Sequence, residues 1–123
     1  MSSVQFTMRV KIESLNRLNT MHWRARKRYA DPLKTQAYLE TKAARPSGGP
    51  PWVVTMTRIA PRALDSGDNN RAGFKGIRDS IAKALGLDDG PDSPITWVYD
   101  QERGGVREYA ARVEIKGMDK ARA

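Results

Sequence analysis

The chain opens with a regular alternation of apolar and polar residues. From Val4 to Ile12 every second side chain is apolar, and those between are polar or charged. This period of two predicts a half-buried strand over 4–12. The runs 52–60, 95–101 and 106–116 are also rich in β-branched and aromatic residues, and they predict three more strands. Two consecutive glycines between the last two runs indicate that these strands form a hairpin.

Two segments carry the signals of helices. Asp31 and Pro32 are typical of an N-cap and the first helical position, so a helix is predicted from Pro32 to about Ala44, after a polar loop through Asn19. A second helix is predicted over 70–85, because apolar residues recur there at spacings of three and four and Gly86 supplies a left-handed stop. The stripe of this helix consists of Phe74, Ile77, Ile81 and Leu85.

The order of these elements, β-α-β-α-β-β, predicts an α+β fold with helices packed on a mixed four-stranded sheet. A chain of 123 residues suits one small domain, over 1–117, with a frayed tail over 118–123. The absence of cysteine excludes disulfides, thiolate metal sites and cysteine nucleophiles. We expect a cytoplasmic protein with no membrane partner, because no signal-peptide pattern or long apolar run is present.

The net charge of +8 is unevenly distributed. The segment 14–45 carries eight basic residues against two acidic ones, whereas 58–92 carries six of each. Basic and aromatic side chains interleaved in this way suit contact with nucleic-acid phosphates and stacking on unpaired bases, although a merely solvated helical face also fits the pattern. The candidate DNA-binding residues are Arg17, His22, Trp23, Arg24, Arg26, Lys27, Arg28 and Lys34.

Carboxylates flank the second predicted helix. Asp65 and Asp68 precede the helical run that carries Lys75, and Asp88 and Asp89 follow it. Oxygen ligands on a basic protein predict a site for Mg²⁺ or Mn²⁺, the ions that assist phosphodiester hydrolysis. Two other interpretations stay open: the first two aspartates could cap the helix, and the later pair could belong to an ordinary turn.

Four ordered motifs together suggest a family. They are L-D-S-G-D-N, F-K-G-I-R-D-S-I-A-K-A-L-G, L-D-D-G and W-V-Y-D-Q-E-R-G-G, and the N-terminal run S-L-N-R-L-N-T-M-H-W-R-A-R accompanies them. In this set the chain resembles the RusA-type Holliday-junction resolvases, especially their phage and prophage branch. The resemblance implies a homodimeric, Mg²⁺-dependent endonuclease of branched DNA. It also implies metal-binding aspartates at Asp65, Asp68 and Asp89, supported by Asn69 and Lys75.

The sequence thus predicts a structure-selective endodeoxyribonuclease that resolves four-way junctions in recombination or repair. A two-fold dimer suits this task, because resolution needs two symmetric cuts. One alternative is a noncatalytic nucleic-acid-binding module. It is favoured if the extra residue at Ser66-Gly67, where the family pattern has a single residue between the two aspartates, disrupts the metal site. Another is a protein-interaction domain with capped helices and a basic solvated face.

The predicted helix also separates the candidate ligands. Sixteen residues at about 1.5 Å each put the two ends of 70–85 roughly 24 Å apart. Metal ligands all lie within about 2 Å of the ion, so Asp89 cannot join Asp65 and Asp68 within one chain. We therefore predict a composite site, with Asp65 and Asp68 from one subunit and Asp89 from its partner.

Overall fold

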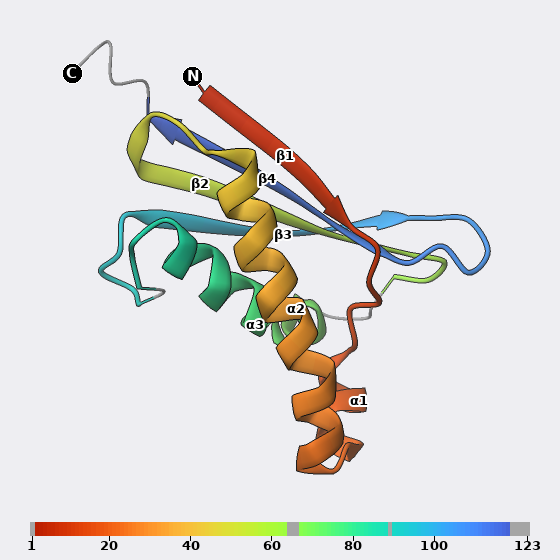
Figure 1. Cartoon of the computed structure of the whole chain (residues 1–123). Coiled ribbons are helices and arrows are strands. Elements are labelled where there is room, and N and C mark those ends of the chain that lie inside the picture. The colour runs from red at the N-terminus through yellow and green to blue at the C-terminus, as the bar shows by residue number, and fades with distance from the viewer. Residues whose placement is uncertain (1, 64–66, 89, 119–123) are drawn as a thin grey trace.

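The computed structural model describes residues 2–63, 67–88 and 90–118, with the backbone alone at residue 2 and residues 67–70. Over these residues the elements follow the order β-α-α-β-α-β-β, an α+β organisation as predicted (Figure 1). They are β1 (Ser2–Met8), α1 (Leu15–Thr20), α2 (Trp23–Ala44), β2 (Gly49–Ala60), α3 (Gly67–Ala84), β3 (Ile95–Arg103) and β4 (Ala110–Met118).

The four strands form one mixed sheet in the order β1-β4-β2-β3. β4 pairs antiparallel with both β1 and β2, and β2 pairs in parallel with β3. The predicted hairpin between the last two strands is therefore wrong, because β2 lies between β3 and β4. The reason is the β2-α3-β3 crossover: a helix between two strands allows them to pair in parallel side by side, which leaves the other edge of β2 for β4.

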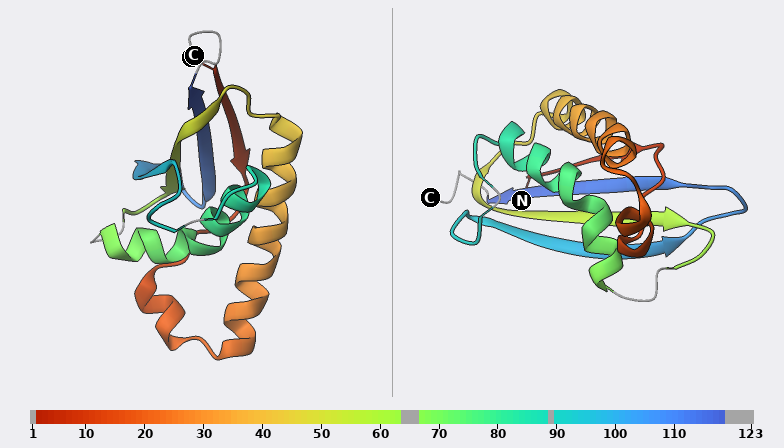
Figure 2. Two further views of the ribbon diagram at one scale, coloured as in Figure 1. Left: turned by 90° about the vertical axis from the view of Figure 1, so that its left-hand side faces the viewer. Right: turned by 90° about the horizontal axis from the view of Figure 1, so that it is seen from below.

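Helices α2 and α3 cover the same face of the sheet (Figure 2). The predicted stripe of α3 is confirmed, since Phe74, Ile77 and Ile81 are fully buried and Leu85 packs half-buried against the core. The predicted stop is confirmed as well: Gly86 has a φ of 77°, and its N–H donates to the carbonyl of Lys83. These contacts fix α3 against the sheet along its whole apolar stripe.

The start of α2 differs from the prediction. The helix begins at Trp23 with His22 as its N-cap, and Pro32 lies inside it. A proline removes one hydrogen bond, here that to the carbonyl of Arg28. Arg28 and Pro32 are both exposed, so water can satisfy that carbonyl, and the helix continues through the proline. The Asp31-Pro32 pair therefore does not mark a helix start.

The remaining bounds shift by a few residues. The predicted loop before α2 contains α1, whose first turn is capped by the Ser14 hydroxyl accepting from the N–H of Arg17 at 3.1 Å. β1 ends at Met8, although Ile12 is buried as predicted. β4 begins at Ala110 and includes Met118, the first residue of the predicted tail, while residues 119–123 lie outside the described residues. None of the helices in the described part of the chain is long and apolar enough to cross a membrane.

Candidate nucleic-acid interface and metal site

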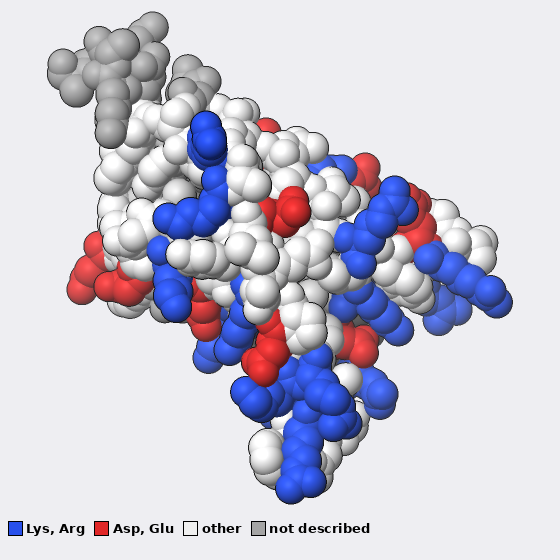
Figure 3. Space-filling view, viewed as in Figure 1, with Lys and Arg blue, Asp and Glu red and all other residues white. Residues whose placement is uncertain are grey.

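α1 and the first half of α2 form a helical hairpin that projects beyond the sheet (Figures 1 and 2). We call this hairpin, residues 15–34, the basic arm. Lys and Arg side chains gather over its projecting end (Figure 3). The exposed cations of the arm are Arg17, Arg24, Arg26, Lys27, Arg28 and Lys34. The structure thus brings all the charged residues of the predicted DNA-binding set onto one projection.

His22 and Trp23 stand at the turn between the two helices of the arm. Trp23 is 63% exposed, and the guanidinium of Arg24 lies 5.2 Å from the centre of its ring. The His22 ring lies 5.6 Å from the Trp23 ring, and its Nδ1 accepts a hydrogen bond from the N–H of Arg24. His22 therefore has a capping role in the fold, whereas the Trp23 ring is presented to solvent beside cations.

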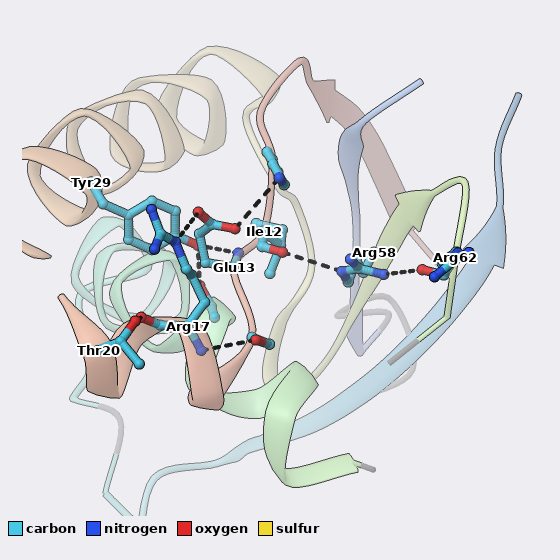
Figure 4. Close-up of polar contacts among 10 residues, drawn as sticks. Ile12, Glu13, Arg17, Thr20, Tyr29, Arg58 and Arg62 are labelled. Carbon is cyan, nitrogen blue, oxygen red and sulfur yellow. Dashed lines mark hydrogen bonds and ion pairs between the residues drawn. The ribbon is translucent and has the colours of Figure 1, made fainter. Parts of the chain in front are cut away.

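Tyr29 fastens the arm to the rest of the domain (Figure 4). Its hydroxyl accepts a hydrogen bond from the N–H of Glu13 at 2.9 Å and donates one to the carbonyl of Gly73 on α3 at 3.2 Å. Burial raises the pKa of Tyr29 to about 12. A Cβ at Gly73 would overlap the carbonyl of Glu13 and the side chain of Ile12, so glycine is required for this close approach. The hydroxyl thus joins the β1–α1 connection, α2 and α3 at one point.

Arg58 on β2 holds two connections together (Figure 4). Only 7% of the residue is exposed, and burial lowers the pKa of its guanidinium. Its Nε donates to the carbonyl of Ile12 at 3.2 Å, and its Nη1 donates to the carbonyl of Arg62 at 2.7 Å. Arg58 therefore fixes both the segment that leads into the basic arm and the segment that leads toward Asp65.

Sequence reasoning missed the roles of Arg58 and Tyr29. In the sequence Arg58 contributes only one positive charge to the balance of 58–92, although an arginine within a largely apolar strand is a signal of a buried polar anchor. Tyr29 stands in the basic and aromatic run, where the local pattern does not mark it as an anchor. The partners of both residues are distant backbone groups, and no local pattern reveals those.

Most of the predicted metal ligands fall where side chains are not described. Asp65 and Asp89 lie outside the described residues, and Asp68 and Asn69 lie in the first turn of α3, where only the backbone is described. The helix has 18 residues, which at 1.5 Å each gives a length of about 27 Å. Position 68 and Asp88 therefore lie at opposite ends of α3, as the composite-site prediction requires.

Asp88 belongs to the turn after α3. Its Oδ1 accepts hydrogen bonds from the N–H of Gly90 at 2.9 Å and from the hydroxyl of Ser93 at 2.8 Å. The same hydroxyl lies 2.6 Å from the backbone carbonyl of Asp88. These hydrogen bonds are those of an ordinary turn, so the turn interpretation fits Asp88. Asp89 is the candidate metal ligand of the pair.

Comparisons with known proteins do not assign the chain to a family. No protein-family model matches the chain, and no curated protein matches its sequence. The resemblance to RusA-type resolvases thus remains a prediction from the four sequence motifs.

The polar side of α3 carries three cations beside the sheet edge. Lys75 and Arg71 are exposed, and Arg78 is half-buried. The Nη1 of Arg78 donates to the hydroxyl of Tyr99 at 3.0 Å, and its guanidinium lies 5.0 Å from the centre of the Trp97 ring. Trp97 and Tyr99 pack half-buried against the core, and their rings lie beside Arg78 and Arg71 respectively. The polar side of α3 is therefore basic, and Lys75 projects from it.

Proposed function

We propose that this chain is a Mg²⁺- or Mn²⁺-dependent endodeoxyribonuclease that cleaves four-way junctions or related branched DNA, similar to RusA-type resolvases. The observation that carries the proposal is the basic arm, which projects from the fold and presents an exposed tryptophan. The arm contacts α3, whose first turn holds Asp68 and whose polar side bears Lys75. The expected setting is the cytoplasm of a bacterial or phage-infected cell.

The basic arm would supply affinity for DNA. Cations on exposed helices contact phosphates and release counterions, which gives strong, salt-dependent and sequence-independent binding. Trp23 lies at the turn of the arm, and unpaired bases at a branch point present faces on which an aromatic ring can stack. The arm thus offers a reason for preferring branched DNA to a continuous duplex.

The candidate metal ligands fit a hard divalent cation by their chemistry. Three carboxylates and the amide of Asn69 provide oxygen donors only, which is the set that Mg²⁺ and Mn²⁺ prefer. When bound, such an ion lowers the pKa of a coordinated water and neutralises charge on the scissile phosphate. Lys75 lies two helical turns after Asp68 and is exposed, so its ammonium could stabilise the charge that develops on that phosphate.

A homodimer completes the proposal. α3 is about 27 Å long, and position 68 and the turn around Asp88 lie at its opposite ends within one chain. A two-fold axis that sets two copies of α3 antiparallel would bring the end of one helix beside the start of the other. Each composite site would then contain Asp65 and Asp68 from one subunit and Asp89 from its partner, and the two sites would make the two symmetric cuts.

A substrate panel tests the nuclease proposal. Purified protein is incubated with labelled four-way junction, flap and linear duplex, each with Mg²⁺, with Mn²⁺ and with EDTA. We expect cleavage of branched DNA with either metal and none with EDTA. If no substrate is cut with any divalent metal while all three bind equally well, the nuclease proposal is wrong.

One observation favours the noncatalytic binding module as a second candidate. α3 begins at Gly67, which puts Asp68 in its first turn, where a carboxylate stabilises a helix by about 0.3–1 kcal/mol without any metal. In that case DNA binding would fall with rising salt and would not depend on Mg²⁺. A protein-interaction domain would show neither cleavage nor salt-dependent DNA binding.

A further inference from the structure

A cleft of about 170 Å³ lies between α2 and α3, where the basic arm meets the domain. Arg26 and Lys34 line it from α2, and Lys75 and Asp79 line it from α3. Arg26, Lys34 and Lys75 are exposed, and Asp79 is half-buried. Three cations against one carboxylate give the cleft a net positive charge, contributed by two different helices.

The cleft exists because its walls are made of small residues. Ala30, Ala72, Gly73 and Gly76 are among its lining. A Cβ built at Gly76 would lie 3.1 Å from Cγ and 3.3 Å from Cε of Lys34, closer than ordinary van der Waals contact. The stem of Lys34, out to its Cε, thus lies across the bare backbone of Gly76 on α3.

The floor of the cleft is held in place by hydrogen bonds. Tyr29 lines it, and the Tyr29 hydroxyl bonds to the carbonyl of Gly73. Leu33 is buried below. Because this floor ties α2 to α3, the two helix backbones that carry the cations are held together before any ligand binds.

We propose that this cleft binds a phosphate of the DNA backbone, held by Arg26 and Lys34 next to Lys75. The inference rests on the proposed function, because DNA is the ligand. The cleft is continuous with the basic arm through Arg26 and Lys34, and it shares Lys75 with the polar side of α3. A strand that follows the arm would pass through the cleft on its way to Lys75. The cleft therefore positions the strand for cleavage, apart from the affinity supplied by the end of the arm.

A double-mutant cycle tests this proposal, with one change at Lys34 and the other at a single phosphate of the DNA. Affinity is measured in EDTA, without cleavage, for four-way junctions that carry one neutral methylphosphonate at successive positions near the branch. In the wild-type chain, one position should weaken binding by roughly fivefold. With Lys34→Gln the same methylphosphonate should have little further effect, because the charge it removes has already lost its partner. The salt dependence should fall by about one unit of log-log slope.

Two further variants sharpen the test. The loss of affinity caused by Arg26→Gln should likewise be less than additive with a methylphosphonate at the same phosphate or at its neighbour. Lys42→Gln is the matched control, because Lys42 is exposed on α2 but lies near Tyr38 and outside the cleft lining. With Lys42→Gln the methylphosphonate should weaken binding as much as it does in the wild-type chain.

The outcomes separate this inference from the nuclease proposal. If the effects of Lys34→Gln and of every methylphosphonate simply add, the cleft holds no phosphate and the inference is overturned. Cleavage of unmodified junction by the wild-type chain with Mg²⁺ is scored separately, so it can stand while the cleft fails. Coupling without cleavage would support the cleft and overturn the nuclease proposal. A wild-type chain that binds no DNA would overturn both.

Discussion

The Nη1 of Arg58 donates a hydrogen bond of 2.7 Å to the backbone carbonyl of Arg62. The same guanidinium donates through Nε to the carbonyl of Ile12, more than forty positions away in the sequence. A single buried side chain on β2 thus anchors the approach to the basic arm and the approach to the carboxylate-rich run. Together with Tyr29, which ties the arm to α3, Arg58 therefore helps to set the relative position of the two halves of the proposed site.

Removal of this anchor should lower stability. Arg58→Met keeps a long apolar stem but removes both hydrogen bonds, so the carbonyls of Ile12 and Arg62 lose their partner. The free energy of unfolding should fall by about 2 kcal/mol or more, as measured by urea denaturation. Arg62→Ala is the control, because Arg62 contributes its carbonyl and not its side chain to this contact. An Arg58→Met variant as stable as Arg62→Ala would contradict the anchoring role.

Tyr29 should make stability depend on pH in the alkaline range. The raised pKa of about 12 means that the folded chain keeps the phenol proton where the unfolded chain, with a pKa near the ordinary 10, has lost it. The contribution is fully present below pH 10 and is lost as the pH rises through 12, at up to about 1.4 kcal/mol per unit. The stability advantage of wild type over Tyr29→Phe should therefore narrow between pH 10 and 12. A difference that stays constant over this range would contradict burial of the hydroxyl.

Trp23 should discriminate branched from continuous DNA. Stacking on an unpaired base is worth about 1–3 kcal/mol, so Trp23→Ala should weaken junction binding by roughly five- to a hundredfold while duplex binding changes little. Trp23→Phe should recover part of the loss. Leu39→Ala is the control, since Leu39 is a large apolar residue on α2 that is 59% exposed and lies outside the arm. Equal losses of affinity for junction and for duplex would contradict the stacking role.

Mixed dimers test whether the metal site is shared. An Asp68→Asn chain paired with an Asp89→Asn chain leaves one composite site intact and damages the other twice. Single-strand nicking should return in the mixture, although neither homodimer cuts. If each site were built within one chain, both sites would stay damaged and no nicking would return.

The elements with strong local signals could be predicted from the sequence. The stripe from Phe74 to Leu85 and the stop at Gly86 specify α3, because apolar spacing and a left-handed glycine act within a few residues. The start of α2 was missed, since Pro32 lies on an exposed face where the helix tolerates it. The position of β4 was missed for another reason: strand order depends on which edge of β2 the crossover through α3 occupies.

The candidate site also has parts that could be predicted from the sequence and parts that could not. The concentration of basic residues over 14–45 could be predicted, because it is a property of the sequence, whereas the helical hairpin that presents them could not. The cleft between Lys34 and Gly76 could not, because it depends on the packing of α2 against α3. The hydrogen bonds of Tyr29 and Arg58 also escape prediction, since each joins a side chain to the backbone of a distant segment.

The most direct test of the account is a paired assay of Asp68→Asn. This change removes one candidate metal ligand and one negative charge and keeps the size of the side chain. Junction cleavage with Mg²⁺ should fall by roughly a hundredfold or more, the scale expected when an electrostatic contribution to catalysis is lost, while junction affinity in EDTA should hold or rise. Cleavage by Asp68→Asn at near the wild-type rate would contradict the account and would leave Asp68 as no more than a stabiliser of the first turn of α3.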